Sequence, residues 1–97
     1  DKMKGLLEMQ RKMQEVKRTL EETNFDLQSN DGVVKITMNG AQEVRAITVK
    51  DNLTEQERSR LAATLKDTFN RSIKRSQEIA AQKMREVAGG LNIPGLT

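Results

Sequence analysis

The chain has 97 residues, of which 35% are hydrophobic and only two are aromatic, both Phe, and its 17 basic and 14 acidic residues give a net charge of +3. One domain, residues 1–97, fits this length, because two domains would leave neither with enough apolar surface for a core. No apolar stretch approaches the roughly 20 residues that cross a bilayer, and no signal-peptide pattern opens the chain, so we expect a protein without membrane contact that is not exported.

The sequence lacks the residue types on which most enzyme sites depend. It contains no His and no Cys, which removes the commonest nucleophile, the commonest general base near neutral pH and the usual zinc ligands. The absence of Cys also excludes disulfides, which fits a reducing compartment. We therefore expect no enzymatic activity, no metal, no cofactor and no small-molecule substrate.

The first predicted element is a helix over residues 2–22. Its apolar residues recur at steps of three and four, the a/d spacing of a coiled-coil seam: Leu6, Met9, Met13, Val16 and Leu20. Two interpretations stay open, a helix packed on the protein's own sheet and a helix paired with another helix, because so few heptads do not separate them. In either case we expect this seam to serve in packing and dimerisation.

Three antiparallel strands are predicted over residues 24–50. Phe25 and Leu27 alternate with polar residues in the first strand, and a β-branched run over 33–38 forms the second. The return strand is predicted over 41–49. Together with the two helices this gives an α+β fold of the order α-β-β-β-α.

The turn between the second and third strands is predicted from the pair Asn39-Gly40. This pair is typical of a type I′ hairpin, in which both central residues have positive φ. The apolar positions then change face within the return strand, which predicts a β-bulge near Arg45 or Ala46.

A long second helix is predicted over residues 54–88. It begins with a capping box, in which Thr54 and Glu57 satisfy free backbone N–H groups, and the two glycines that follow predict its end and a tail over 89–97. At 1.5 Å per residue the helix is about 50 Å long, whereas a compact globule of 100 residues is roughly 34 Å across. Such a helix must either protrude or be kinked. The same arm of a second copy, related by a two-fold axis, would cover its apolar face, so we expect a tweezer-like homodimer.

The apolar face of this long helix changes along its length. Its bulky part, which we assign to the packing and dimer seam, consists of Leu65, Phe69 and Ile73. Beyond it the residues on that face become small or polar, so the tip should pack less firmly than the base.

Charge indicates the class of partner. Residues 1–20 carry six basic and three acidic residues, and residues 71–97 carry five and two. On the second helix the basic residues have only Glu78 nearby on the same side, and we predict that they contact phosphates: Arg71, Lys74, Arg75 and Arg85. With no Trp or Tyr for base stacking, duplex DNA bound through its backbone is the favoured partner.

The first helix carries a second set of candidate DNA-contacting cations. They are Lys4, Arg11 and Arg18, each followed four residues later by a Glu. This spacing is typical of ion pairs on a solvated helix face. We therefore expect their charge to be neutralised and place them second to the cations of the other helix.

Several segments resemble the YbaB/EbfC family of bacterial nucleoid-associated DNA-binding proteins. They are QRKMQE at 10–15, GVVKITMNG at 32–40, EVRAITV at 43–49 and the tail at 89–96. The resemblance implies a helix, a three-stranded sheet and a long helix, paired as a tweezer-shaped homodimer. It also implies a protein of the bacterial cytoplasm that binds DNA in the nucleoid and influences nucleoid organisation and gene expression. Because the chain begins at Asp1 and not at Met, we expect an N-terminal extension to precede it.

Two alternative functions remain. The first is an adaptor or scaffold of coiled-coil type that binds another protein through its Met-rich first helix, because Met side chains adapt to varied surfaces. The second is an enzyme that works with carboxylates alone. Salt dependence separates DNA binding from an apolar protein contact, because only phosphate contacts release counterions.

Overall fold

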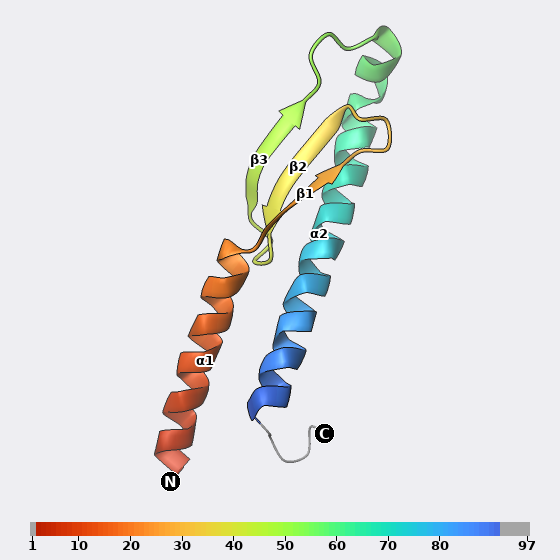
Figure 1. The fold of residues 1–97 in the computed structure, drawn as a ribbon. Helices are drawn as coiled ribbons and strands as arrows, with labels where there is room; N and C mark the ends of the chain where they lie inside the picture. Colours follow the sequence, from red (N-terminus) through yellow and green to blue (C-terminus); the bar gives the residue numbers. More distant parts are fainter. Residues whose placement is uncertain (1, 92–97) are drawn as a thin grey trace.

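The computed structural model describes residues 2–91 and contains two helices and three strands (Figure 1). In chain order the elements are α1 (Lys2–Glu22), β1 (Asn24–Gln28), β2 (Val34–Asn39), β3 (Val44–Val49) and α2 (Glu55–Leu91). The predicted α-β-β-β-α order and the bounds of the first helix are confirmed. Residues 92–97 of the predicted tail lie outside the described residues.

The sheet is antiparallel with the order β1-β2-β3, and α2 packs on β2 and β1. The core lies between α2 and the central strand, where the buried side chains are those of Val33, Val34, Ile36 and Met38. Successive residues along β2 point to opposite faces of the sheet, so Lys35, between the buried Val34 and Ile36, is exposed. The partly buried residues around this core include all three of the predicted helix seam: Leu65, Phe69 and Ile73.

The predicted bulge in β3 is confirmed. Thr37 pairs with Ala46 whereas the next residue, Met38, pairs with Val44, so Arg45 is the extra residue. The bulge brings Val44 to the same face of the sheet as Ile47, because antiparallel partners point to one face.

The predicted type I′ turn is wrong. β2 continues through Asn39, Gly40 has no positive φ, and the left-handed residue is Gln42 at φ 61°. The N–H of Gln42 donates to the carbonyl of Asn39 (3.2 Å), and the N–H of Asn39 donates to the carbonyl of Glu43 (3.0 Å). A three-residue loop therefore replaces the predicted two-residue one, and the return strand begins at Val44 instead of residue 41.

Gly40 is required by close packing. A Cβ built on it would lie 2.8 Å from Cδ2 of Leu20 on α1 and 3.3 Å from Cγ2 of Ile79 on α2. Its N–H also donates to the carbonyl of Leu20 (2.9 Å) near the end of α1, where helix carbonyls lack partners within the helix. The hairpin tip thus sits against both helices.

Asn39, which is fully buried, ties the same tip to α1. Its Nδ2 donates to the carbonyl of Glu21 (3.0 Å) and to Oε1 of Glu43 (2.8 Å). Its Oδ1 accepts from the backbone N–H groups of Ala41 (3.0 Å) and Glu43 (2.9 Å). The side-chain amide therefore uses both of its donor hydrogens and both acceptor positions.

Ser76 joins α2 to the hairpin. Its buried hydroxyl donates to the carbonyl of Asn39 (2.8 Å) and accepts from the N–H of Gln42 (3.1 Å). We call the set of Asn39, Gly40 and Ser76 the hairpin junction, because it connects the two helices through the turn between β2 and β3.

Small hydroxyl residues line the part of α2 that faces the core. Thr68 and Ser72, both fully buried, donate to the carbonyls one turn earlier, at 2.7 and 2.8 Å. Their hydroxyls are therefore satisfied without a partner on the sheet. Since these side chains are short, the helix backbone approaches the sheet closely between the bulkier residues at its sides.

The start of α2 is confirmed and its end is corrected. Thr54 N–H donates to Oε1 of Glu57 (2.9 Å) and Glu57 N–H donates to Oγ1 of Thr54 (3.1 Å), which is the predicted capping box. The helix then continues through Gly89 and Gly90 to Leu91 instead of stopping at residue 88. Glycine ends a helix where it adopts a left-handed conformation, and neither glycine does so here.

The length of α2 makes the molecule elongated. Its 37 residues span about 55 Å at 1.5 Å per residue, and the chain measures 65 × 22 × 15 Å. The radius of gyration is 18.5 Å, against about 13 Å for a compact domain of this size. The predicted protruding arm is therefore present, and Figure 1 shows that α1 and the last half of α2 form it together.

The first prediction concerns Gly40. Gly40→Ala should lower the free energy of unfolding by about 1–3 kcal/mol, because the new methyl group overlaps Leu20. The same change in a Leu20→Ala background should cost less, since the overlapping atoms are absent. Urea unfolding of the four proteins measures this coupling. Gly5→Ala on α1, where a Cβ meets no atom within 4 Å, is the control and should stabilise the helix by about 0.5–1 kcal/mol.

The second prediction concerns Asn39. Asn39→Ala should destabilise the protein by about 2–4 kcal/mol, because it leaves several buried polar groups without partners. Asn70→Ala, an exposed change on α2, should stay within about 0.5 kcal/mol of the unchanged protein. Thermal unfolding followed by circular dichroism measures both, and equal melting temperatures would contradict the structural role of the junction.

Candidate nucleic-acid interface

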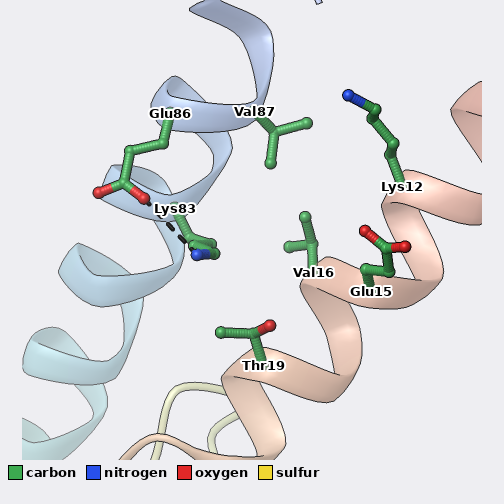
Figure 2. Close-up of a pocket in the computed structure, with 7 residues that line it drawn as sticks. All are labelled: Lys12, Glu15, Val16, Thr19, Lys83, Glu86 and Val87. Atoms are coloured by element: carbon green, nitrogen blue, oxygen red, sulfur yellow. Dashed lines mark ion pairs between the residues drawn. The ribbon is translucent and has the colours of Figure 1, made fainter. Parts of the chain in front are cut away.

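The two helices of the arm run antiparallel and touch along a narrow line. Val16 of α1 is 5% exposed, and Figure 2 shows it opposite Val87 of α2 across an open hollow of about 290 Å³. Polar residues flank this contact: Lys12, Glu15 and Thr19 on α1, and Lys83 and Glu86 on α2. Val16 is thus the one residue of α1 that is buried, and the contact between the helices beyond the junction is mostly polar at its borders.

The predicted seam of α1 is only partly covered. Val16 is buried and Leu20 is partly buried, but Leu6, Met9 and Met13 are 64%, 40% and 41% exposed. α1 extends away from the sheet instead of lying on it (Figure 1). The interpretation as a helix packed on the protein's own sheet is therefore wrong for the first half of α1, and the other interpretation, pairing with another helix, stays a prediction.

The cations predicted to be neutralised on α1 are exposed. Lys4, Arg11 and Arg18 lie seven residues apart, which is close to two turns, so they share one face of the helix. We call them the α1 basic stripe. Within residues 2–91, Arg11 and Arg18 form no ion pair, so the predicted pairs with Glu15 and Glu22 are absent.

The cations of α2 are more compensated than the sequence suggests. Nε of Arg71 lies 3.1 Å from Oδ2 of Asp67, and its guanidinium donates to the carbonyl of Gln28 at 3.3 Å. This second bond ties α2 to the end of β1. Asp67, one turn before Arg71, is thus an acidic neighbour of this cluster in addition to the predicted Glu78.

Three further cations of α2 differ in their surroundings. Arg75 lies 3.5 Å from Glu78, and Arg85 donates to Oε1 of Gln82 at 2.8 Å. Lys74 is exposed and makes no hydrogen bond or ion pair with another residue of 2–91. Exposed pairs are worth little, about 0–1 kcal/mol, so a phosphate could still replace the acids as partner. Lys74 needs no such exchange.

The structure adds two lysines to the sequence-based set. Lys12 and Lys83 both line the hollow between the helices in Figure 2, although Lys83 is engaged with Glu86 at 3.6 Å. Sequence reasoning misses both, because their meeting depends on how α1 and α2 are placed side by side. The adjacency of Lys12 to Arg11 is the one signal that the sequence offers.

Two carboxyl groups with shifted pKa values lie in turns away from the arm. The hydrogen bond from the hydroxyl of Ser29 (2.6 Å), followed by that from the N–H of Val33 (3.0 Å), lowers the pKa of Asp31. The N–H of Thr54, followed by the ammonium group of Lys50, lowers the pKa of Glu57. Both carboxylates stabilise local turns, at the start of β2 and the start of α2.

The described residues offer little for other chemistries. Over residues 2–91, no three acidic side chains come together as a metal site would require. The helices in this part of the chain also contain no segment long and apolar enough to cross a membrane.

Comparison with known proteins identifies a DNA-binding family, as the exposed cations of the helices would lead one to expect. A model of the YbaB/EbfC DNA-binding family matches residues 1–91. The chain belongs to this family. Membership in the YbaB/EbfC family confirms the resemblance seen in the sequence motifs and supports a DNA-binding, nucleoid-associated role.

A solved structure has the same fold. It is described as the crystal structure of uncharacterized protein HP0035 from Helicobacter pylori, and it matches with a TM-score of 0.65 and 19% sequence identity over 79% of this chain and 90% of that one. At this identity the match supports the fold alone. The arrangement of helix, sheet and long helix in this YbaB/EbfC chain is therefore shared with a protein of very different sequence.

Proposed function

We propose that this YbaB/EbfC-family protein is a non-enzymatic homodimer that binds duplex DNA, mainly through its backbone phosphates. The observation that carries the proposal is the set of exposed cations along the two-helix arm, with Arg11, Arg18 and Lys74 making no ion pair among residues 2–91. Flexible cations on a helix surface match the regular spacing of phosphates without selecting a base sequence.

The chain has few means of reading bases by stacking. Its aromatic residues are Phe25 and Phe69, and both are partly buried against the core. Recognition of single strands or of RNA bases depends on exposed aromatic rings. We therefore propose that the protein binds DNA through phosphate contacts with little base readout. It would do so in the nucleoid of the bacterial cytoplasm, with effects on nucleoid organisation and gene expression.

An exposed apolar strip on β3 supports the homodimer. Val44, Ile47 and Val49 are 43%, 47% and 37% exposed. They pair with Met38, Ile36 and Val34, so they point to the face of the sheet that packs on α2. Whereas α2 buries the residues of β2, all six residues of β3 are exposed. A second copy related by a two-fold axis would cover this strip, which we call the β3 strip.

The third prediction tests DNA binding. Reversing charge at Arg71, Lys74 and Arg75 should weaken binding to duplexes of specific and random sequence alike, because phosphate contacts do not depend on sequence. The slope of log affinity against log salt is negative. Measured between about 50 and 200 mM salt, it should become shallower by about 0.9 for each phosphate that the variant no longer binds. Fluorescence anisotropy with a labelled duplex measures affinity and slope together.

A matched control carries the same change of charge away from the arm. Lys35→Glu, Arg58→Glu and Arg60→Glu alter exposed residues of β2 and of the start of α2, and should leave the slope nearly unchanged. Reversal of charge at Arg11 and Arg18 should also make the salt slope shallower. If the three-residue change on α2 has no effect while the dimer stays intact, the DNA contacts belong to the α1 basic stripe instead.

The fourth prediction tests the dimer. Ile47→Glu places a charge in the β3 strip and should convert a dimer to a species near the 11.0 kDa of one chain, because an unpaired charge in an apolar contact is costly. Thr48→Glu, one residue away on the opposite face, should leave the dimer intact. Analytical ultracentrifugation distinguishes the outcomes, and a dimer that persists in the Ile47 variant would place the interface elsewhere.

A further inference from the structure

α1 presents a second apolar surface, separate from the β3 strip. Five large apolar side chains in its first half are exposed by 40 to 72%: Met3, Leu6, Leu7, Met9 and Met13. Leu6, Met9 and Met13 line an open hollow of about 540 Å³ together with Gln10 and Gln14. Leu7 lies apart from these residues, beside Lys4 and Arg11. Soluble proteins rarely expose several large apolar side chains together on one surface without a function. We call Leu6, Met9 and Met13 the free seam.

The free seam and the α1 basic stripe lie on opposite sides of one helix. In heptad terms Leu6 and Met13 occupy position a and Met9 occupies position d. Lys4, Arg11 and Arg18 then occupy position f, which is the position farthest from the a/d seam. α2 covers the continuation of the same seam at Val16, together with the residues that line the hollow in Figure 2. The free seam can therefore be occupied while the stripe contacts DNA.

The residues beside the seam decide what kind of helix can cover it. Positions e and g, which flank the seam, hold no acidic residue. They are Met3, Gly5, Gln10, Lys12, Lys17 and Thr19. In a parallel pair, a residue at g lies beside the following e residue of the other helix. A second copy of α1 would therefore bring its Lys17 next to Lys12, and these charges repel.

An antiparallel pair of α1 helices also lacks complementary charges beside the seam. Such a pair places e beside e and g beside g, and neither position supplies an acid to either lysine. A helix with Glu or Asp at its flanking positions would instead attract both lysines. The seam is thus complementary in charge to a foreign acidic helix and not to itself.

We infer that the free seam of α1 docks an amphipathic helix of a partner protein, with acidic residues beside its apolar stripe, while the opposite face of α1 remains available to DNA. The side chains at the seam suit this role, because Met adapts its shape to varied apolar surfaces. This surface makes α1 a link between DNA and a second protein, and the inference rests on the proposed DNA binding only for that link.

The test uses the full chain and a synthetic three-heptad peptide with Leu at positions a and d and Glu at e and g. Calorimetry should show binding of this peptide, and much weaker binding of the same peptide with Lys at e and g. Met13→Gln should weaken the binding by about tenfold or more. Met84→Gln is the matched control, because Met84 on α2 is 39% exposed against 41% for Met13, and it should leave binding unchanged.

A charge swap separates specific docking from general attraction to a basic protein. In Lys12→Glu/Lys17→Glu the preference should reverse, so that the Lys-flanked peptide binds more tightly. A labelled duplex should join the complex with the Glu-flanked peptide instead of displacing it, and Met13→Gln should leave duplex affinity unchanged. The duplex measurements keep a failure of this inference distinct from a failure of DNA binding.

Several results would overturn the inference. Equal affinity for the Glu- and Lys-flanked peptides, or an equal loss in the Met13 and Met84 variants, would contradict a specific seam. A loss of self-association in Met13→Gln would assign the seam to a second copy. Binding to phosphatidylglycerol vesicles that is lost in Met13→Gln, without binding of either peptide, would assign it to an anionic lipid surface.

Discussion

The arrangement of this molecule depends on the hydrogen bonds and close packing at the hairpin junction. α1 has only a short contact with the rest of the chain, yet its last carbonyls are bound by the side chain of Asn39 and the N–H of Gly40. Ser76 fixes the same turn to α2. Because these groups are buried, each unmade bond would carry the full cost of desolvation. A few polar interactions thus set the direction of a long helix.

The junction determines where the surfaces of the arm lie. It holds α1 beside the last half of α2, so that Val16 is buried while the free seam and the α1 basic stripe face away from this contact. Separate faces allow one slender helix to contact different partners. The proposed dimer uses the β3 strip, which is on the sheet and leaves the arm exposed.

The structure changes how charge is divided between the helices. Acids on α2 pair with Arg71 and Arg75, whereas Arg11 and Arg18 on α1 stay unpaired within residues 2–91. Spacing of three or four residues permits such pairs but does not enforce them, because long side chains lose rotamer entropy in forming a weak exposed bond. α1 therefore has a larger place in the proposed DNA contact than its sequence suggests.

The elements whose signals are local could be predicted from the residues alone. Periodicity defined α1, the capping box of Thr54 and Glu57 defined the start of α2, and the change of face in β3 placed the bulge near Arg45 or Ala46, of which the structure shows Arg45. The motifs around residues 32–49 indicated the family. The packing of the whole chain was needed to explain why Gly40 is glycine, why Asn39 and Ser76 are buried, and which part of the α1 seam is free. These depend on the distance between segments far apart in the chain, and neither residue spacing nor local propensity encodes that distance.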